Sequence, residues 1–428
     1  MSTAIIKKSE LNGSVKAPAS KSVAHRMMLC AALSRSKCYI HNITDSDDMS
    51  ATIGCLSSLG AKITKEGTTV FIDATSFASD KTKHYTLNCI ESGTTLRIMI
   101  PVCAALGLHV TFIGEGKLPQ RPLDEYLTLL PKHSVEIEKG DSSLPLTIKG
   151  QLCGDVFSVS PKVSSQYVTG LIFALSLLKN DCKLNLLSEL VGGQYVDITT
   201  SVMKKFGVTV VKTRNSYSIK GMQKYTPASD TLNVEGDWSQ AAFFLCCGAI
   251  KGSITVTNID TKSTQGDKKI IDFLKAFNAD ITINDDSVSV RKSNLIGTDI
   301  DATDTPDLVP VLSVLASFAQ GETNIHGVSR LKFKESDRLL STSQMINSLG
   351  GCATYTDDCM TIKSTNKLTG GDVDGFNDHR IVMSSAIAGA FCENTTTIRQ
   401  ANAVNKSYTN FFDDYKSLGG ICDVIMGK

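Results

Sequence analysis

The chain repeats one pattern six times with a period of about 70 residues, and this repeat constrains the fold more than any other feature. An apolar stretch of helical length recurs after Lys21, Gly93, Ser164, Asp237, Pro306 and Asp378. Equivalent positions are separated by 72, 71, 74, 68 and 72 residues, counted between Ser22, Thr94, Ser165, Ser239, Asp307 and His379. A period of this length is too long for common solenoids and suits a unit of two helices and several strands.

Each apolar stretch is followed by a β-like segment and a second helix. Most of these second helices close on a residue that tolerates left-handed backbone, which commonly ends a helix: Gly60, Gly207, Asn278, Gly350 and Gly419. The second repeat departs from this pattern, and Pro131 is expected to end its helix.

Six units divide naturally into two sets of three. The sequence therefore predicts an α/β protein of two domains, one comprising residues 14–232 with repeats 1–3, the other residues 1–13 plus 233–428 with repeats 4–6. A first strand near residues 5–11 precedes the first repeat and is expected to pair with the second half.

Composition excludes several classes of function. The 44 basic and 43 acidic side chains give a net charge of +1, which argues against a protein that coats nucleic acid or anionic membrane. Aromatic residues make up 6% of the chain, too few for a base-stacking platform. The N-terminus has no apolar core of signal-peptide length, and no apolar stretch is long enough for a membrane span.

Cofactor motifs are also absent from the sequence. The thirteen cysteines show no zinc-ligand spacing and are expected to be free thiols in a reducing cytoplasm. There is no P-loop and no dinucleotide-binding glycine motif, so neither ATP nor a dinucleotide is inferred, and no metal or cofactor is expected.

Polar and cationic residues gather at the starts of the six apolar helices and in the adjoining loops. Helix N-termini attract phosphate and carboxylate groups. If the six helices occupy equivalent places, their N-termini would point to a common region. Seven cations are expected to serve one cleft between the domains: Lys21, Arg26, Arg121, Lys334, Arg338, Arg380 and Lys406. Asp307 and Glu335 are the acids in this setting and hence the acid/base candidates.

Each of these residues also has a purely structural interpretation. Ser165 suits a simple helix N-cap, His379 and Arg380 a surface pair, and KESDR a solvated helix face. Their recurrence at matching positions of the repeats favours a binding site for a ligand with several phosphate or carboxylate groups.

Nine short motifs follow one another along the chain: PASKSVAHR, ESGTTLR, QRP, SSQYVTG, YVDIT, PDLVP, KESDR, NDHR and NKSYTNFF. On these motifs the chain resembles the 3-phosphoshikimate 1-carboxyvinyltransferase (EPSP synthase) family, and the resemblance runs from Lys21 to Lys406. It implies a two-domain inside-out α/β barrel of six βαβαββ repeats, joined by two crossover strands. It also implies transfer of the enolpyruvyl group of phosphoenolpyruvate to the 5-hydroxyl of shikimate 3-phosphate, with release of phosphate and with domain closure over the substrates.

The resemblance further implies roles for individual residues. The shikimate carboxylate would be held by Ser22 and Arg26, its phosphate by Ser164, Ser165 and Lys334, and its ring region by Gln166, Tyr195 and Asp307. Phosphoenolpyruvate would be bound by Lys21, Gly93, Arg121, Gln166, Arg338, Arg380 and Lys406. Glu335 would exchange the proton at the methyl carbon, and either Asp307 or Lys21 would take the hydroxyl proton. A monomer is expected.

Three positions depart from the common family pattern, namely Glu91, Gly192 and Arg330. Gly93 matches the glycine associated with glyphosate sensitivity, so inhibition competitive with phosphoenolpyruvate is expected. The alternative is the sister enzyme that uses UDP-N-acetylglucosamine, which carries a loop cysteine near the arginine equivalent to Arg121. The stretch GEGKLPQRPLD contains no cysteine, which favours the shikimate enzyme.

Overall fold

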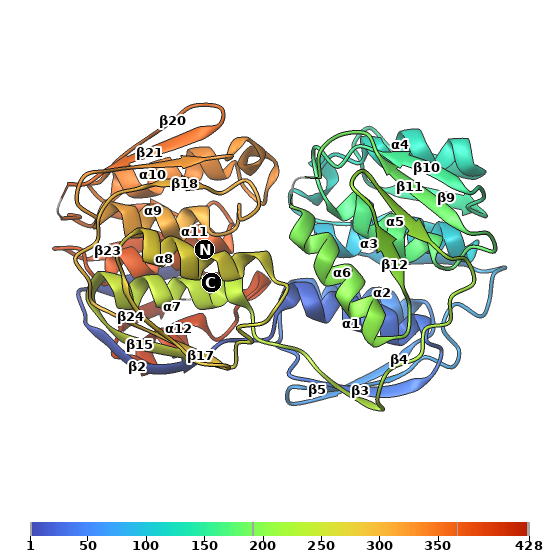
Figure 1. The fold of residues 1–428 in the computed structure, drawn as a ribbon, viewed down its shortest axis with the longest axis horizontal. Coiled ribbons are helices and arrows are strands. Elements are labelled where there is room, and N and C mark those ends of the chain that lie inside the picture. Colours follow the sequence, from blue (N-terminus) through green and yellow to red (C-terminus); the bar gives the residue numbers. More distant parts are fainter. Residues whose placement is uncertain (1, 191, 366, 426–428) are drawn as a thin grey trace. The chain divides into compact units, whose positions relative to one another are not determined.

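The computed structural model describes residues 2–190, 192–365 and 367–425, and the chain folds into two compact units. Unit 1 comprises Met1–Ala19 and Glu235–Lys428, and unit 2 comprises Ser20–Val234. Within each unit, three four-stranded sheets surround a set of central helices (Figure 1). The repeats predicted from the sequence therefore correspond to six sheets of one design.

Every sheet has the same internal order. The first two strands are parallel, the third pairs antiparallel with the second, and the fourth pairs antiparallel with the third. In unit 2 the sheets are β14(Thr231–Asn233)–β3(Lys37–His41)–β5(Thr69–Asp73)–β4(Lys62–Glu66), β6(His84–Asn88)–β7(His109–Ile113)–β9(Leu146–Gly150)–β8(Val135–Lys139), and β10(Val156–Val159)–β11(Cys182–Leu186)–β13(Ser216–Ile219)–β12(Val210–Lys212).

Unit 1 repeats this arrangement. Its sheets are β2(Leu11–Lys16)–β15(Gly252–Thr257)–β17(Ser287–Arg291)–β16(Asp280–Ile283), β18(Asp299–Asp301)–β19(Glu322–His326)–β21(Cys359–Lys363)–β20(Cys352–Tyr355), and β22(Asp372–Asp374)–β23(Thr396–Arg399)–β1(Thr3–Lys7)–β24(Ile421–Ile425). Three strands pair with strands far away in the sequence. β1 and β2 precede the residues of unit 2 in the chain but complete sheets of unit 1, and β14 completes the first sheet of unit 2.

This strand exchange refines the prediction for the N-terminus. The expected pairing of the first strand with the second half is confirmed, since β1 lies between β23 and β24. The predicted segment is, however, split between two strands, and the second, β2, pairs with β15 along its whole length, from Leu11 with Gly252 to Lys16 with Thr257. The unit boundary consequently follows Ala19 instead of residue 13, and the second boundary follows Val234 instead of residue 232.

The helices alternate between a buried and a half-exposed type. Unit 2 contains α1(Lys21–Leu33), α2(Asp47–Ser58), α3(Gly93–Leu106), α4(Asp124–Leu129), α5(Gln166–Leu175) and α6(Gly193–Lys205). Unit 1 contains α7(Trp238–Lys251), α8(Ile270–Ala276), α9(Val309–Ser317), α10(Arg338–Ser348), α11(His379–Gly389) and α12(Phe411–Ser417). Short 3-10 helices occupy Leu118–Gln120, Leu130–His133, Gly266–Lys269, Ser329–Phe333 and Ala401–Lys406.

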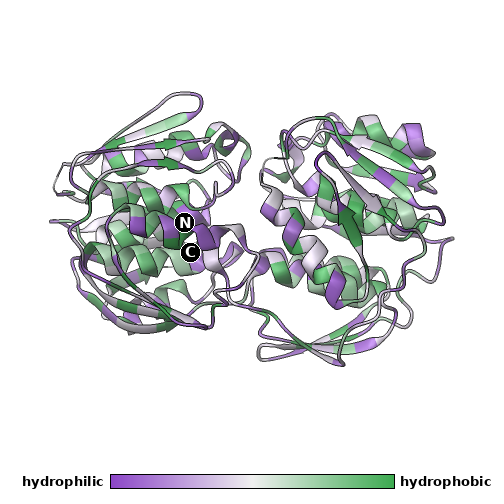
Figure 2. Ribbon diagram, viewed as in Figure 1, coloured by the Kyte–Doolittle hydropathy of each residue, from purple (hydrophilic) through white to green (hydrophobic). Residues whose placement is uncertain are grey.

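The first helix of each repeat forms the core of its unit. All residues of α9 and α11 are buried, and α7 is buried from Gln240 to Ile250. A helix that is apolar on all sides needs cover on all sides, which the surrounding sheets and neighbouring helices provide. These central helices are correspondingly rich in apolar residues (Figure 2).

The ends of the second helices agree with the sequence prediction. Gly60, Gly207, Asn278, Gly350 and Gly419 all have positive φ angles, between 64° and 98°. In the second repeat α4 ends at Leu129, and Pro131 lies in the 3-10 turn that follows. Two first helices begin later than expected, since α5 starts at Gln166 and α9 at Val309, which leaves Ser164, Ser165 and Asp307 in the preceding turns.

Candidate active site

A buried arginine at the start of α10 organises the acidic residues of unit 1. The guanidinium of Arg338 is 1% exposed and contacts three carboxylates. Its Nη1 donates to Asp307 Oδ1 at 2.6 Å, its Nη2 to Glu335 Oε2 at 2.6 Å, and its Nε to Asp378 Oδ2 at 2.8 Å. Both predicted acids, Asp307 and Glu335, are therefore held in fixed orientations by the same cation.

Two further cations contact Asp307. Lys334 Nζ lies 3.3 Å from Oδ1, and Arg380 Nη2 lies 3.5 Å from Oδ2. Burial alone would raise the pKa of Asp307, but Lys334, Arg380 and Arg338 together hold it well below the ordinary value. Burial also lowers the pKa of Lys334, although Asp307 opposes that shift. Asp307 is consequently an anion at neutral pH, surrounded by donors.

The N-terminus of α11 brings the last predicted cations to the same place. Asp378 is fully buried and caps the helix by accepting from Arg380 N at 2.9 Å, and it also accepts from Ser336 Oγ at 2.9 Å. Burial would raise the pKa of Asp378, but Arg338 outweighs it and the pKa is lowered. Lys406 Nζ donates at 2.9 Å to the carbonyl of Asn377, the residue before Asp378.

In unit 2, the start of α1 carries the first predicted cluster. Arg26 is 2% exposed and donates to the Ser22 carbonyl at 2.7 Å, to the Tyr195 carbonyl at 2.9 Å and to Thr199 Oγ1 at 2.7 Å. Burial lowers the pKa of Arg26 to about 10, so it stays charged at neutral pH. Lys21 Nζ forms an ion pair with Asp48 Oδ2 on α2 at 2.8 Å. These contacts fix the N-terminus of α1 against α2 and α6.

The starts of α3 and α5 form the second cluster of unit 2. Gln166 bridges them, because its Nε2 donates to Thr94 Oγ1 at 2.9 Å while its Oε1 accepts from Arg97 Nη1 at 2.9 Å. A Cβ atom on Gly93 would lie 2.5 Å from Arg121 Nη1, so the guanidinium of Arg121 rests directly against the glycine. Gly93, Arg121 and Gln166 thus occupy one neighbourhood.

The structural interpretations of several motifs do not hold. The side chain of Ser165 makes no capping hydrogen bond to α5, and Ser164 Oγ instead accepts from Gln166 N at 3.2 Å. His379 and Arg380 are 2% and 4% exposed, which excludes a surface pair. Arg338 lies in the core, so KESDR is not a solvated helix face.

One of the departures from the family pattern has a backbone explanation. Gly192 precedes α6 with φ of 74°, a left-handed conformation that favours glycine over serine. For Arg330, which lies in the 3-10 turn Ser329–Phe333, and for Glu91, which lies near Gly116, the structure offers no comparable reason.

Two supporting residues were missed by the sequence analysis. Asp378 was seen only as part of a helix start, because an N-cap aspartate is common and its contact with Arg338 spans 40 residues. Arg97 lies inside the apolar run of α3, where its 5% exposed side chain orients Gln166 and also donates to the Pro122 carbonyl at 3.2 Å. A charged residue inside an otherwise apolar helix was the available signal.

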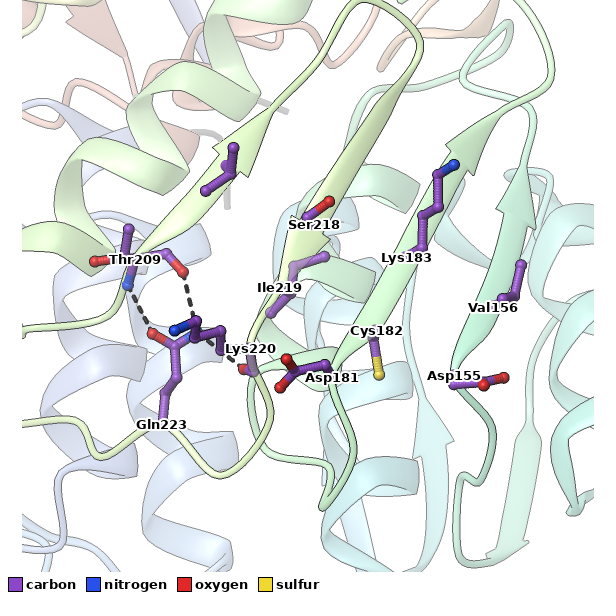
Figure 3. Close-up of a pocket in the computed structure, with 11 residues that line it drawn as sticks. Asp155, Val156, Asp181, Cys182, Lys183, Thr209, Ser218, Ile219, Lys220 and Gln223 are labelled. Carbon is purple, nitrogen blue, oxygen red and sulfur yellow. Dashed lines mark hydrogen bonds between the residues drawn. The ribbon is translucent and has the colours of Figure 1, made fainter.

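A depression of about 680 Å³ lies elsewhere in unit 2, along the third sheet. Figure 3 shows its lining side chains, which come from β10 to β13 and the adjoining turns, with Gln223 hydrogen-bonded to Thr209. Its lining contains none of the residues predicted for the site. This depression is therefore separate from the candidate chemistry.

Among the described residues, no group of three or more His, Cys, Asp or Glu side chains is arranged to hold a metal ion. None of their helices combines the length and apolar character needed to cross a bilayer. All thirteen cysteines are free thiols.

Carboxylates held by arginine and lysine near helix N-termini, with pKa values shifted by burial and by these charges, are typical of an enzyme active site. The EPSP synthase (3-phosphoshikimate 1-carboxyvinyltransferase) family model matches residues 5–415. The 3-phosphoshikimate 1-carboxyvinyltransferase of Clostridium perfringens is 41% identical over 424 residues, covering 98% of this chain and 99% of the relative. That of Clostridium kluyveri is 41% identical over 419 residues, covering 98% and 97%.

A solved structure agrees in fold. EPSP synthase from Acinetobacter baumannii superposes with a TM-score of 0.82 at 23% identity, covering 99% of this chain and 100% of that one. The chain belongs to the EPSP synthase family and is a transferase of the shikimate pathway. The alternative assignment to the sister enzyme that uses UDP-N-acetylglucosamine is not favoured.

The ion network makes a prediction about stability. Asp378→Asn leaves Arg338 buried with one carboxylate fewer, and we expect it to lower the free energy of unfolding of unit 1 by about 3 kcal/mol at neutral pH. The single tryptophan, Trp238, is buried in α7, so urea unfolding followed by its fluorescence reports on unit 1. Because the folded-state pKa of Asp378 is lowered, the difference should be complete above the ordinary pKa of an aspartate, 3.8, and shrink as pH falls below it.

Asp285→Asn is the matched control, since this side chain is 95% exposed and should change stability by less than about 0.5 kcal/mol. Equal effects of the two variants would contradict the proposed importance of the buried network.

Proposed function

We propose that the chain transfers the enolpyruvyl group of phosphoenolpyruvate to the 5-hydroxyl of shikimate 3-phosphate. The observation that carries the proposal is the set of three cations around Asp307, with Glu335 held beside it by Arg338. A reaction between two anions needs concentrated positive charge, and a proton transfer to carbon needs a positioned acid.

We assign shikimate 3-phosphate to eight residues. Ser22 and Arg26 would bind its carboxylate, and Ser164, Ser165 and Lys334 its phosphate. Gln166, Tyr195 and Asp307 would contact the ring and its hydroxyls. The absence of a capping hydrogen bond from Ser165 supports its role, because the hydroxyl is not needed to complete α5. The chemistry of Lys334 suits a phosphate ligand, since a lysine ammonium acts as a movable point charge.

We assign phosphoenolpyruvate to Lys21, Gly93, Arg121, Gln166, Arg338, Arg380 and Lys406. Arg121 and Gly93 are neighbours, which supports a shared ligand. The guanidinium groups suit two-pronged binding of carboxylate and phosphate. The close approach of Arg121 to Gly93 also leaves little room for a side chain at that position.

The proposed chemistry is addition followed by elimination. The 5-hydroxyl oxygen attacks C2 of phosphoenolpyruvate while Glu335, in its protonated form, delivers a proton to C3. The tetrahedral intermediate then loses phosphate as the Glu335 carboxylate takes a proton back from C3, and the proton of the hydroxyl passes to the departing phosphate. The Arg338 contact at 2.6 Å keeps the Glu335 carboxyl oriented throughout. Each proton given to carbon is thus recovered.

Asp307 is the better candidate for the hydroxyl proton. Its low pKa makes it a weak base before the attack, so it first accepts a hydrogen bond and takes the proton only as the attacked hydroxyl becomes strongly acidic. Lys21 forms an ion pair with Asp48, which requires the protonated ammonium form, so it is better suited to donate to an anion.

We further propose that the enzyme works in the cytoplasm as a monomer. The thirteen free thiols support a reducing compartment, because disulfides form and persist mainly in oxidising ones.

The direct test of the function is phosphate release from a mixture of the two substrates. We expect release with shikimate 3-phosphate and none with UDP-N-acetylglucosamine; the reverse pattern would reject the proposal. Glu335→Gln should lower kcat at least about 100-fold, because the amide cannot exchange a proton, while both KM values stay within about threefold. The control is Glu322→Gln on β19, a half-exposed glutamate paired with Lys363, which should leave kcat unchanged.

Gly93 generates a prediction about glyphosate. Inhibition should be competitive with phosphoenolpyruvate in the wild type, and Gly93→Ala should raise the inhibition constant at least about tenfold, because the new Cβ displaces the tip of Arg121. Thermal stability should change little, since only a flexible side chain has to move. Gly54→Ala on α2 is the matched control, with no atom within 4 Å of its new Cβ. Unchanged inhibition in Gly93→Ala would contradict this assignment.

A further inference from the structure

A buried carboxyl group that the proposed chemistry does not use lies against the N-terminus of α7. The segment Gln265–Asp267 packs there, with Gln265 Oε1 accepting from Trp238 N at 3.1 Å and Asp267 Oδ2 accepting from Ser239 Oγ. Asp267 is 4% exposed, and among the described residues its Oδ1 has no hydrogen-bond partner. A buried, half-satisfied carboxyl group is costly and therefore calls for an explanation.

Asp267 reaches the active site through Ser239. The backbone carbonyl of Ser239, whose hydroxyl binds Asp267, accepts from Arg380 Nη1 at 3.3 Å. The other terminal nitrogen of Arg380 lies 3.5 Å from Asp307 Oδ2. Arg380 thus lies between Asp307 and Ser239, and the hydroxyl of Ser239 binds the Asp267 carboxyl group.

We propose that Asp267 is a positioning residue that acts through Arg380 and makes the binding of phosphoenolpyruvate depend on pH. This inference rests on the proposed assignment of Arg380 to phosphoenolpyruvate. With Asp267 neutral, only Asp307 competes with the substrate for the positive charge of Arg380. An ionised Asp267 partly neutralises that charge and repels the anionic substrate.

The charge state of Asp267 changes in the physiological range. Burial is the largest influence and raises its pKa to about 7, and the negative charges of Asp307 and Asp237 act in the same direction. Arg380 and the Ser239 hydroxyl oppose them. Asp307 stays ionised through this range, because its own pKa is held low.

The other charged groups of the surrounding elements are engaged elsewhere. Lys268 Nζ donates to the Thr261 and Ser263 carbonyls, and Lys269 Nζ to the Asp301 carbonyl. On the approach to α7, Glu235 accepts from Ser263 Oγ and Gln265 Nε2. Asp272 on α8 is exposed. Arg338 repels Arg380 but is itself bound to three carboxylates.

The sign of the effect follows from linkage. An anion that binds Arg380 raises the pKa of Asp267 further, so substrate binding takes up a proton. In the wild type the KM for phosphoenolpyruvate should therefore rise as pH increases through 7. The effect should fall on KM and leave kcat nearly unchanged, because Asp267 does not touch the reacting atoms.

The test compares wild type with Asp267→Asn between pH 6 and pH 8.5. We expect the ratio of the wild-type KM for phosphoenolpyruvate to that of the variant to rise from about 1 to at least about 3 across this range. Taking the ratio at each pH cancels the ionisation of the substrate itself. The KM for shikimate 3-phosphate should keep a constant ratio, whereas a merely structural defect would alter both.

A second variant keeps the proposal testable if Asp267→Asn folds poorly. Ser239→Ala removes the hydroxyl that lowers the pKa of Asp267, so the rise in KM should move to higher pH. Asp272→Asn is the control and should follow the wild type. A constant ratio for phosphoenolpyruvate, or a rise in KM that Ser239→Ala does not move, overturns the proposal while phosphate release by the wild type still supports the function.

Discussion

The site in unit 1 depends on one interaction, the burial of Arg338 among Asp307, Glu335 and Asp378. A guanidinium offers five donors in a fixed plane, so a single side chain can orient three carboxylates that come from three separate segments. Burial of this charge is costly unless oxygen atoms of carboxyl groups surround it, so removing any of the three acids would leave the guanidinium poorly compensated. The position of α10 relative to α9 and α11 is therefore tied to the chemistry, since a shift of any one helix would leave a buried charge without its partner.

The same physics gives two aspartates of one unit opposite properties. Asp307 and Asp267 both act on the charge of Arg380. Burial by itself would raise the pKa of each aspartate. Three cations overcome burial at Asp307, whereas at Asp267 the opposing Arg380 and Ser239 are outweighed. One carboxylate is thus kept as a constant anion and the other titrates near neutral pH. Neither behaviour follows from the residue type.

The repeat in the sequence predicted the architecture well, because helix starts and left-handed helix ends are local features. Gly60 and Gly419 end their helices as expected, and the starts of α1, α3 and α11 agree with the pattern. The pairing of β2 with β15 and of β14 with β3 was harder to predict from the sequence, since these strand partners lie far apart in the chain. The roles of Asp378 and Asp267 were missed for the same reason, because each depends on a partner brought close only by the fold.

The ion network keeps Asp307 ionised, whereas Asp267 changes its charge near neutral pH. Carbon-13 NMR of aspartate-labelled protein measures this directly, with the two carboxyl resonances assigned by their loss in Asp307→Asn and Asp267→Asn. We expect the Asp267 resonance to titrate near pH 7 and the Asp307 resonance to show no titration down to the ordinary pKa of 3.8. A titration of Asp307 at or above that ordinary value would show that the three cations do not hold its pKa down.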